Sequence, residues 1–344
     1  MKKNRLLIST LNGYKNYGNR LQLFALSTVL SKYIDSKNIY LYWPKKTYEI
    51  TKDFIKTKYA LKNKALKYIK IHRFTKKNTP RRTNKICPSD QIVVGSDQVW
   101  NPKYLKNRKY LIDFLKKEIR ISYAASMGVE ILSDEQKESF AKALKHYKAI
   151  SVREESAKKL LQPLTSKEVK VVLDPTLLLN KIKYAQLEKK PKDIKESEKY
   201  ILCYILGNRE HQEFINTFAQ KNNYRIILFS DKTGSNYGVE EFLYLIHHAQ
   251  LICTDSFHAC VFSFIFERPF IAFKRTGEAN YMYSRLQNLI DTFHLKNREF
   301  NGKEITKENL EVDYSEAKKI LKKEQEKSIK FLKNALDITE KSDG

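Results

Sequence analysis

The sequence predicts an α/β fold made of two domains that face each other across a cleft. Three observations lead to this prediction. The chain has 344 residues, more than one domain of ordinary size contains. Short apolar runs alternate with helical patterns, which is typical of parallel sheets covered by helices. A charged, Pro-containing stretch after Leu179 lacks apolar periodicity, and it therefore separates two such α/β arrays.

The first domain is predicted to span residues 1–180. Apolar runs bounded by polar residues indicate its strands, and helical periodicity fills several of the intervals between them. The predicted strands are residues 6–9, 39–43, 91–94, 121–124, 149–152 and 169–173, and the predicted helices are residues 19–33, 134–147 and 154–161.

A basic segment at residues 45–86 is predicted to be a helical insertion in this domain. It contains 15 Lys or Arg residues against 2 acidic ones, which is half of the net charge of +26. Ile55, Tyr59, Leu66 and Ile69 fall at spacings that a helix places on one side. Such a helix suits a surface of anionic lipid. A lysine-rich face that is merely solvated explains the charge equally well.

Residues 181–199 are predicted to be a linker, and residues 200–312 a second α/β domain. Its predicted strands are residues 200–206, 225–229, 251–254 and 270–273, and its predicted helices are residues 211–221, 238–247, 258–266 and 281–289. A long charged helix at residues 315–336 occupies most of the final segment, residues 313–344. A cleft between two such domains is a usual place for a ligand.

Cysteine usage and apolar run lengths indicate where the protein works. The four cysteines show no metal-type pairing, and three lie in apolar surroundings, which fits a reducing cytoplasm. No uncharged apolar run reaches the roughly 18 residues of a membrane helix. The apolar run at residues 6–8 is too short for a signal peptide. We therefore expect a cytoplasmic protein, with residues 45–86 as its point of peripheral contact with the inner face of the membrane.

The most informative motif lies at residues 250–273, where a buried strand becomes a helix. Asp255, Ser256 and His258 follow the strand and would line a crevice beside free backbone amides, which favours an anion. Imidazole suits proton transfer near neutral pH, although a lone histidine is more often structural. His247 and His248 have no ligand-spaced partner nearby in the sequence, and we interpret both as structural.

The strand at residues 91–94 ends in a second group of candidates. Gly95 permits a tight turn there, and Ser96 and Asp97 would project into the cleft. Trp100 supplies a flat apolar wall that suits a sugar or core packing. Capping of a helix is the structural alternative for Ser96 and Asp97.

Two further candidates follow other strands. Arg153 would grip a carboxylate or phosphate with two parallel hydrogen bonds, although a surface salt bridge is the simpler interpretation. Asn19 and Arg20 open the first helix, where a phosphate or an acceptor hydroxyl could bind. The sequence around them is neither a Walker loop nor a GxGxxG fingerprint, so nucleotide binding is only weakly indicated.

Six motifs occur in a characteristic order over residues 16–273. They read NYGNRLQLFAL, VVGSDQVWN, SYAASMG, ISVREES, LDPTLLL and TDSFHACVFSFIFERPF. Each is weak alone, but together they resemble the polysaccharide pyruvyl transferase family. The resemblance implies two Rossmann-like domains facing a cleft, similar to the glycosyltransferase B-type fold. It also implies transfer of a pyruvyl group from phosphoenolpyruvate to two hydroxyls of one sugar, forming a cyclic ketal. The sugar would belong to a cell-surface polysaccharide or its lipid-linked precursor.

The resemblance also implies roles for the candidate residues. The catalytic pair is His258 with Asp255, the donor-binding residues are Arg153, Ser256 and Arg20, and the acceptor-binding residues are Ser96, Asp97, Trp100 and Asn19. Some members of the family carry Arg where this chain has Ser256, so Lys274, Arg275 or Arg20 would have to replace that cation. No cofactor is expected. No carboxylate and histidine cluster with metal spacing occurs, so we predict no structural metal, and we leave open a loosely bound divalent ion that accompanies the donor.

Two other functions remain as alternatives. A glycosyltransferase of the same architecture would bind a nucleotide sugar between residues 204 and 208 and around Glu240 and Glu241. A nucleic-acid-binding protein is supported by the charge alone, because no helix-turn-helix, zinc-finger or RNP-type pattern accompanies it. We therefore expect no specific nucleic-acid partner.

Overall fold

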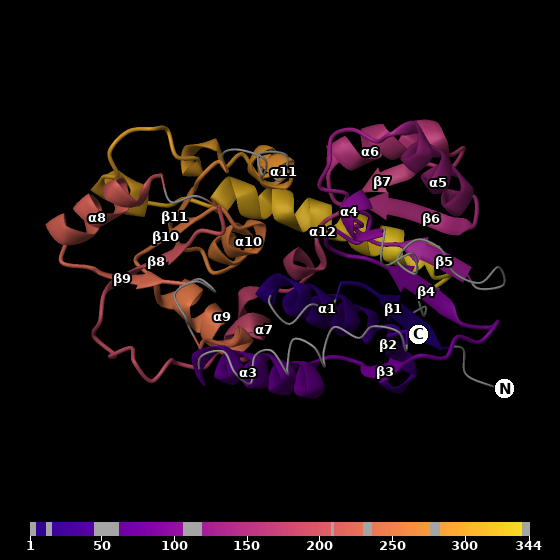
Figure 1. The fold of residues 1–344 in the computed structure, drawn as a ribbon, viewed down its shortest axis with the longest axis horizontal. Helices are drawn as coiled ribbons and strands as arrows, with labels where there is room; N and C mark the ends of the chain where they lie inside the picture. The colour runs from indigo at the N-terminus through magenta and orange to yellow at the C-terminus, as the bar shows by residue number, and fades with distance from the viewer. Residues whose placement is uncertain are drawn as a thin grey trace. The chain divides into compact units, whose positions relative to one another are not determined.

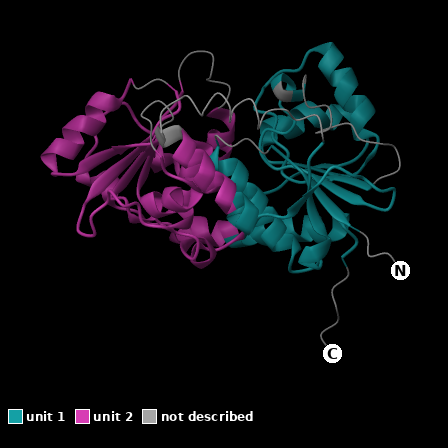
Figure 2. Ribbon diagram, turned by 60° about the horizontal axis from the view of Figure 1, so that its bottom comes forward, with its two compact units in different colours: residues 1–48, 75–178, 322–344 teal, residues 49–74, 179–321 magenta. Residues whose placement is uncertain are grey.

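The computed structural model describes residues 5–11, 16–44, 62–105, 119–207, 210–229, 236–275 and 283–338. The chain divides into two compact units, shown in teal and magenta in Figure 2. Unit 1 contains residues 1–48, 75–178 and 322–344, and unit 2 contains residues 49–74 and 179–321. The chain therefore passes from one unit to the other more often than a division near residues 181–199 implies.

Unit 1 contains a seven-stranded sheet with the order β3-β2-β1-β4-β5-β6-β7 (Figure 1). All of its paired strands are parallel. The strands are β1 (Leu6–Ser9), β2 (Ile39–Tyr42), β3 (Arg81–Thr83), β4 (Gln91–Val94), β5 (Ile119–Ser122), β6 (Tyr147–Val152) and β7 (Val169–Val171). β2 and β3 lie on one side of β1 and the later strands on the other, so the strand order reverses between β1 and β4.

The helices of unit 1 follow its strands in the order expected for a parallel sheet. They are α1 (Tyr17–Leu30), α4 (Pro102–Leu105), α5 (Asp134–Leu144) and α6 (Glu155–Leu161). α1 begins at Asn16, whose side chain caps the helix by accepting a hydrogen bond from the Asn19 amide. The strand residues Leu7, Ile92 and Val152 are completely buried, as expected for strands with both faces covered.

Unit 2 contains a parallel four-stranded sheet with the order β11-β10-β8-β9. Its strands are β8 (Tyr200–Tyr204), β9 (Arg225–Leu228), β10 (Leu251–Thr254) and β11 (Phe270–Ala272). Its helices include α7 (Lys181–Ala185), α8 (Gln212–Lys221), α9 (Val239–His248), α10 (Phe257–Ile265) and α11 (Ser284–Thr292). β9 lies on one side of β8 and β10 on the other, so the strand order reverses between β8 and β10. Every residue of α10 is buried, which explains why its sequence is mostly apolar.

Two helices contain residues of both units, namely α3 (Lys62–Asn78) and α12 (Ser315–Ala335). α3 confirms the predicted helix in the basic segment for residues 62–78, whereas residues 45–61, with Ile55 and Tyr59, lie outside the described residues. Ile71 and Phe74 are its buried apolar residues, and Leu66 and Ile69 are each 39% exposed.

The predicted strands are confirmed, each within two residues at either end, while β3 was not predicted. The α/β prediction is therefore correct for both units. The predicted linker at residues 181–199 differs from the structure, because it contains α7 and belongs to unit 2. The helix predicted at residues 281–289 begins partly outside the described residues, and α11 ends at Thr292. Among the described helices, none is both long and apolar enough to span a lipid bilayer.

Candidate functional site

Each sheet places predicted site residues where its strand order reverses. At such a switch point the loops after the two central strands turn to opposite sides and leave a crevice at the carboxyl ends of the strands. In unit 1, Asn19 follows β1 on α1, and Asp97 follows β4. In unit 2, Asp255 and Ser256 follow β10, beside the turn that follows β8. The topology of each unit therefore gathers residues that are distant in the sequence.

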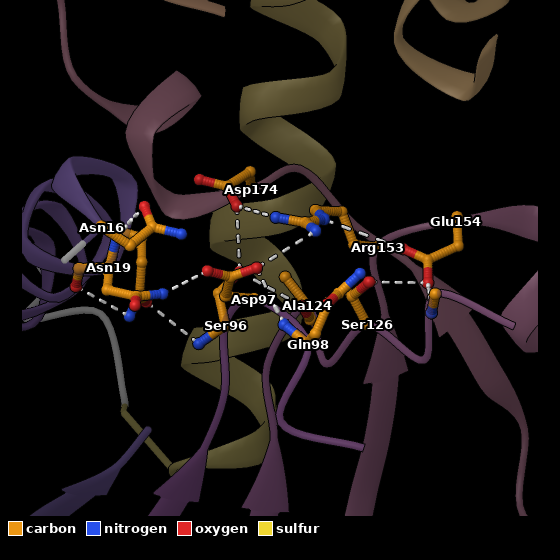
Figure 3. Close-up of polar contacts among 12 residues, drawn as sticks. Asn16, Asn19, Ser96, Asp97, Gln98, Ala124, Ser126, Arg153, Glu154 and Asp174 are labelled. Carbon is orange, nitrogen blue, oxygen red and sulfur yellow. Dashed lines mark hydrogen bonds and ion pairs between the residues drawn. The ribbon is translucent and has the colours of Figure 1, made fainter. Parts of the chain in front are cut away.

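Asp97 bridges the switch point of unit 1 (Figure 3). The Asn19 side-chain amide donates a short hydrogen bond to Asp97 Oδ2, which connects the segment after β1 to the segment after β4. The Gln98 backbone amide donates to Asp97 Oδ1 at 2.9 Å. Asp97 has a φ of 65°, a left-handed conformation in which Asp and Asn are enriched. These contacts hold its carboxylate in one orientation.

Arg153 lies among three carboxyl groups at the carboxyl ends of β4, β6 and β7 (Figure 3). Its Nη1 donates to Asp174 Oδ2 at 2.7 Å, its Nη2 is 3.6 Å from Asp97 Oδ1, and its Nε is 3.7 Å from Glu154 Oε2. Burial alone would lower the pKa of Arg153, but the three carboxyl groups raise it above its ordinary value. Three carboxyl groups surround this guanidinium, so its charge is engaged by groups of the protein itself.

Asp174 and Glu154 complete this arrangement, although neither was among the predicted site residues. Asp174 also accepts from Ser96 Oγ at 3.0 Å. Glu154 Oε1 accepts from Ser126 Oγ at 2.8 Å and from the Met127 amide at 2.9 Å. These bonds give the SYAASMG motif a function in fixing Glu154. The sequence signal that could have revealed Asp174 and Glu154 is their position. Both acids follow strands whose carboxyl ends meet at one edge of the sheet.

Three predicted ligand-binding residues of unit 1 are fully buried, with 0% exposure: Arg20, Ser96 and Trp100. Trp100 packs edge-on against Phe140 and Tyr147, with ring centroids 6.1 and 5.6 Å apart, so core packing describes its contacts. The Ser96 amide donates to Gln22 Oε1 at 3.1 Å, inside the same buried network. None of the three has exposed surface in this structure, and direct ligand contact by them stays a prediction.

Asp255 makes the corresponding connection at the switch point of unit 2. Its Oδ1 accepts from the Leu206 amide and its Oδ2 from the Gly207 amide, both at 2.8 Å, which ties the end of β10 to the turn after β8. Arg275 Nε donates to Oδ2 at 3.0 Å, and Arg275 Nη2 donates to the Asp255 carbonyl at 3.2 Å. Arg275 was one of the cations expected to replace the missing family Arg, and it lies directly beside this site.

Ser256 and His258 lie at the amino end of α10, immediately after Asp255. Ser256 is the N-cap residue, yet its side chain makes no capping hydrogen bond. The Ser256 amide donates to Thr254 Oγ1 at 3.0 Å, which fixes the entry to the helix. His258 is 6% exposed, and its ring meets Phe257 edge-on at a centroid distance of 5.2 Å. Both oxygens of Asp255 are used by Leu206, Gly207 and Arg275, so orientation of the imidazole by Asp255 stays a prediction.

Unit 2 also contains a cavity of about 650 Å³ that is lined by none of the residues predicted for pyruvyl transfer. It is lined by Lys70, Lys189, Lys190, Lys192, Arg225 and Tyr237, among others. Glu241, which the glycosyltransferase alternative would use, also lines it. Its Oε1 pairs with Lys70 Nζ at 2.6 Å and its Oε2 accepts from the Gly238 amide at 2.9 Å, so both oxygens serve the fold.

His247 and His248 share a partner, Glu188, that lies far from them in the sequence. Glu188 Oε1 lies 2.7 Å from His247 Nδ1, and Glu188 Oε2 lies 3.2 Å from His248 Nε2. Glu188 is 59 residues away from His247 in the sequence, so spacing along the chain could not reveal the contact.

Two Rossmann-like sheets, each with polar side chains at its switch point, define a two-unit α/β protein of the glycosyltransferase B-type fold class. The sequence match is more specific. Residues 16–276 match the family model of polysaccharide pyruvyl transferases, and the chain therefore belongs to this family of transferases.

Comparison with solved structures supports the fold. A protein assigned as a UDP-N-acetylglucosamine 2-epimerase of Listeria monocytogenes is similar with a TM-score of 0.50 and 10% identity, covering 95% of this chain and 91% of that one. The N-terminal domain of Candida albicans trehalose-6-phosphate phosphatase has a TM-score of 0.47 and 12% identity over 98% and 97% of the two chains. At these identities the likeness concerns the fold alone. A search of proteins with curated functions finds no match to the sequence.

Proposed function

We propose that this protein transfers a pyruvyl group from phosphoenolpyruvate to two hydroxyls of one sugar. The sugar belongs to a cell-surface polysaccharide or to its lipid-linked precursor, and the product is a cyclic ketal with release of phosphate. Membership of the family supports this assignment. The observation that carries it is the group at the switch point of unit 2, where Asp255 anchors Arg275 beside the amino end of α10.

The reaction requires one group that moves protons, and we assign this role to His258. The enol carbon of the donor accepts two sugar oxygens in turn, its methylene carbon gains one proton and becomes a methyl group, and phosphate leaves. The two hydroxyls lose two protons, of which one matches the proton gained by carbon and the other leaves with phosphate. A histidine suits both removal and delivery of these protons.

The donor is an anion, so its binding site must be cationic or rich in amide donors. We assign donor binding to Ser256, to the backbone amides at the start of α10 and to Arg275. A helix amino end attracts an anion through its free N–H groups and its dipole, and Ser256 leaves these groups without a side-chain cap. Arg275 is 9% exposed at its side chain and is held by Asp255, so its charge is fixed in direction. Asp255 then acts by positioning this cation.

Arg153 has a different role in this proposal. Its guanidinium is surrounded by Asp97, Glu154 and Asp174. We assign Arg153 to positioning the ends of the strands in unit 1. Asp97 and Asn19 remain our candidates for the acceptor, because a carboxylate accepts hydrogen bonds from sugar hydroxyls and a side-chain amide both donates and accepts them.

The test is ligand-dependent stability of the purified chain, followed by a phosphate-release assay. Phosphoenolpyruvate is expected to raise the melting temperature, because binding to the folded state stabilises it by mass action. Arg275→Gln should abolish this shift. Arg225→Gln is the matched control, since Arg225 is an exposed ion-paired arginine of the same unit and should leave the shift unchanged. His258→Ala should bind phosphoenolpyruvate and release no phosphate.

Two outcomes would overturn the assignment. Full phosphate release by His258→Ala would exclude its role in proton transfer. Stabilisation by uridine or guanosine diphosphate without any stabilisation by phosphoenolpyruvate would instead favour a glycosyltransferase that uses a nucleotide sugar.

A further inference from the structure

Glu188, His247 and His248 form a cluster of metal-ligating groups in unit 2, distant along the strands from the site described above. One carboxylate oxygen of Glu188 lies 2.7 Å from His247 Nδ1, and the other lies 3.2 Å from His248 Nε2. The three ligand atoms lie within 4.8 Å of one another. Two imidazoles and one carboxylate thus converge on a single point at the end of α9.

The convergence of two neighbouring histidines requires an explanation, because successive helix residues point about 100° apart. The two rings meet Glu188 through different nitrogen atoms, His247 through Nδ1 and His248 through Nε2. Each ring is also held by an aromatic neighbour. His247 stacks on Phe266 with centroids 4.3 Å apart, and His248 stacks on Tyr244 at 4.1 Å. Both imidazoles are therefore oriented before any ion arrives.

Backbone hydrogen bonds fix the third ligand as well. The Glu188 amide donates to the Ala185 carbonyl and the Lys189 amide donates to the Glu240 carbonyl, each at 3.2 Å. The carboxylate of Glu188 is therefore held where both imidazoles reach it.

We propose that Glu188, His247 and His248 bind a divalent transition-metal ion, with Zn²⁺ as the best match. Two imidazole nitrogens and one carboxylate oxygen are a ligand set that Zn²⁺ accepts, with a fourth position for water. The side chain of His248 is 43% exposed, which leaves one side of the cluster open to solvent. Ligand atoms around tetrahedral Zn²⁺ lie roughly 3.4 Å apart, so the 2.7 Å contact has to open by less than 1 Å.

Binding replaces the two histidine–glutamate hydrogen bonds with bonds to the metal. Each neutral ring keeps its proton and carries it on its other nitrogen, so the ring nitrogen that faces Glu188 presents a lone pair to the ion. No redox step and no co-reactant are needed.

The position of the cluster indicates a structural site. His248 lies three residues before Leu251, which is the first residue of β10. Asp255 directly follows Thr254, which is the last residue of the same strand. A strand of four residues separates the two ends of β10 by roughly 10–13 Å. The ion would join the segment after α7 to the end of α9, and it would stabilise unit 2 without touching the groups assigned to catalysis.

The test is zinc binding to the full chain after removal of metals with a chelator. Isothermal titration with Zn²⁺ should give one ion per chain, and Co²⁺ should give the visible absorption of a four-coordinate site. Glu188→Gln and His248→Ala should each weaken Zn²⁺ binding by about a hundredfold or more. Zn²⁺ should also raise the melting temperature of the wild-type chain and not of these variants.

The matched control is His294→Ala. His294 Nδ1 lies 2.8 Å from Glu316 Oε1 in an exposed pair of the same unit. Among the residues that the structure describes, this pair has no third metal-ligating group beside it. The control should bind Zn²⁺ as tightly as the wild type. Circular dichroism checks that each variant is folded. If Glu188→Gln does not fold, zinc binding by His248→Ala tests the proposal, because this variant removes only a half-exposed ring. Absence of stoichiometric binding, or equal affinity in His248→Ala and the wild type, overturns the proposal.

Discussion

Arg153 shows how a single residue organises the switch point of unit 1. Its guanidinium is the counter-charge of Asp97, Glu154 and Asp174, and its side chain is 3% exposed. Loss of one partner from a buried ion pair leaves uncompensated charge in the interior, which is far more costly than loss of an exposed pair. The role of Arg153 can therefore be measured as stability.

Arg153→Met should lower the free energy of unfolding by about 3–5 kcal/mol. Arg225→Met, which removes the exposed partner of Glu198, should lower it by less than about 1 kcal/mol. Urea unfolding followed by circular dichroism compares the two variants. A folded Arg153→Met protein that is as stable as the wild type but fails to bind phosphoenolpyruvate would instead restore Arg153 as a donor ligand.

Gly95 is the residue at which β4 can turn into the cluster. It has a φ of +129°, and a Cβ built on it would lie 2.1 Å from the Tyr123 carbonyl oxygen. Gly302 has a φ of +81° with no atom within 4 Å of such a Cβ. Alanine substitutions at Gly95 and Gly302 therefore separate two free-energy costs, that of the positive φ and that of the steric clash.

Gly302→Ala should cost about 1–2 kcal/mol, the penalty of positive φ for a residue with a Cβ. Gly95→Ala should cost at least about 3 kcal/mol, because overpacking against a carbonyl adds to that penalty. The free energies of urea unfolding test this order. Equal costs would mean that the turn after β4 can move away from Tyr123.

At the scale of the elements, most strands were predictable because they are short, mainly apolar runs, and β1, β8 and β10 are buried at every residue. The segment that becomes β10 contains no charge and is completely buried in the structure. β3 has the sequence RRT, with both arginines exposed, so no apolar run revealed it. Its position at the edge of the sheet explains why such a sequence is tolerated.

The candidate site was predictable only in part. The local sequence can place Asp255 at the end of a strand. Its contact with the turn after β8, however, depends on the order of the strands in the sheet. The backbone amides that Asp255 binds are 48 and 49 residues away, and Asp174, which Arg153 binds at the shortest distance, is 21 residues away from it. Such pairs are set by strand order in the sheet, and pattern reading along the chain does not supply that order.

α12 supplies a polar anchor to unit 1, although the sequence predicted only a long charged helix there. Ser328 Oγ accepts from the Leu173 amide at 3.0 Å, one residue before Asp174, and Ser328 is completely buried. Ser328→Ala should lower the free energy of unfolding by about 1–3 kcal/mol, because it leaves a buried amide without its acceptor. Ser31→Ala removes an exposed hydroxyl of the same unit and should change it by less than about 0.5 kcal/mol. Urea titrations that give the same value for both variants would contradict the anchoring role of Ser328.

At the scale of the whole molecule, both tryptophans of the chain report on one unit. Trp43 and Trp100 belong to unit 1, so tryptophan fluorescence follows this unit alone, while circular dichroism follows both. The two signals therefore resolve the stability of the units in the intact chain.

Removal of residues 322–344 should destabilise unit 1 selectively. It deletes Ser328, as well as Gln325, whose side chain donates to the Leu177 carbonyl at 2.6 Å. Phe331, which packs against Tyr123 at a centroid distance of 6.4 Å, is lost as well. In urea, the fluorescence midpoint of the truncated chain should fall well below the midpoint of its remaining circular dichroism transition. Coincident midpoints would show that these contacts do not stabilise unit 1 separately.

The division of the chain also determines the order in which the units are completed during synthesis. Unit 1 contains β1, which precedes every strand of unit 2 in the chain, yet it also includes residues 322–338, whereas every segment of unit 2 has been made by residue 321. Unit 2 therefore has all of its sequence while the β6 and β7 end of unit 1 still lacks the residues that satisfy Leu173 and Leu177. A chain cut short after residue 321 would contain all of the second unit and only part of the first, and it is the first one that a chaperone would need to protect.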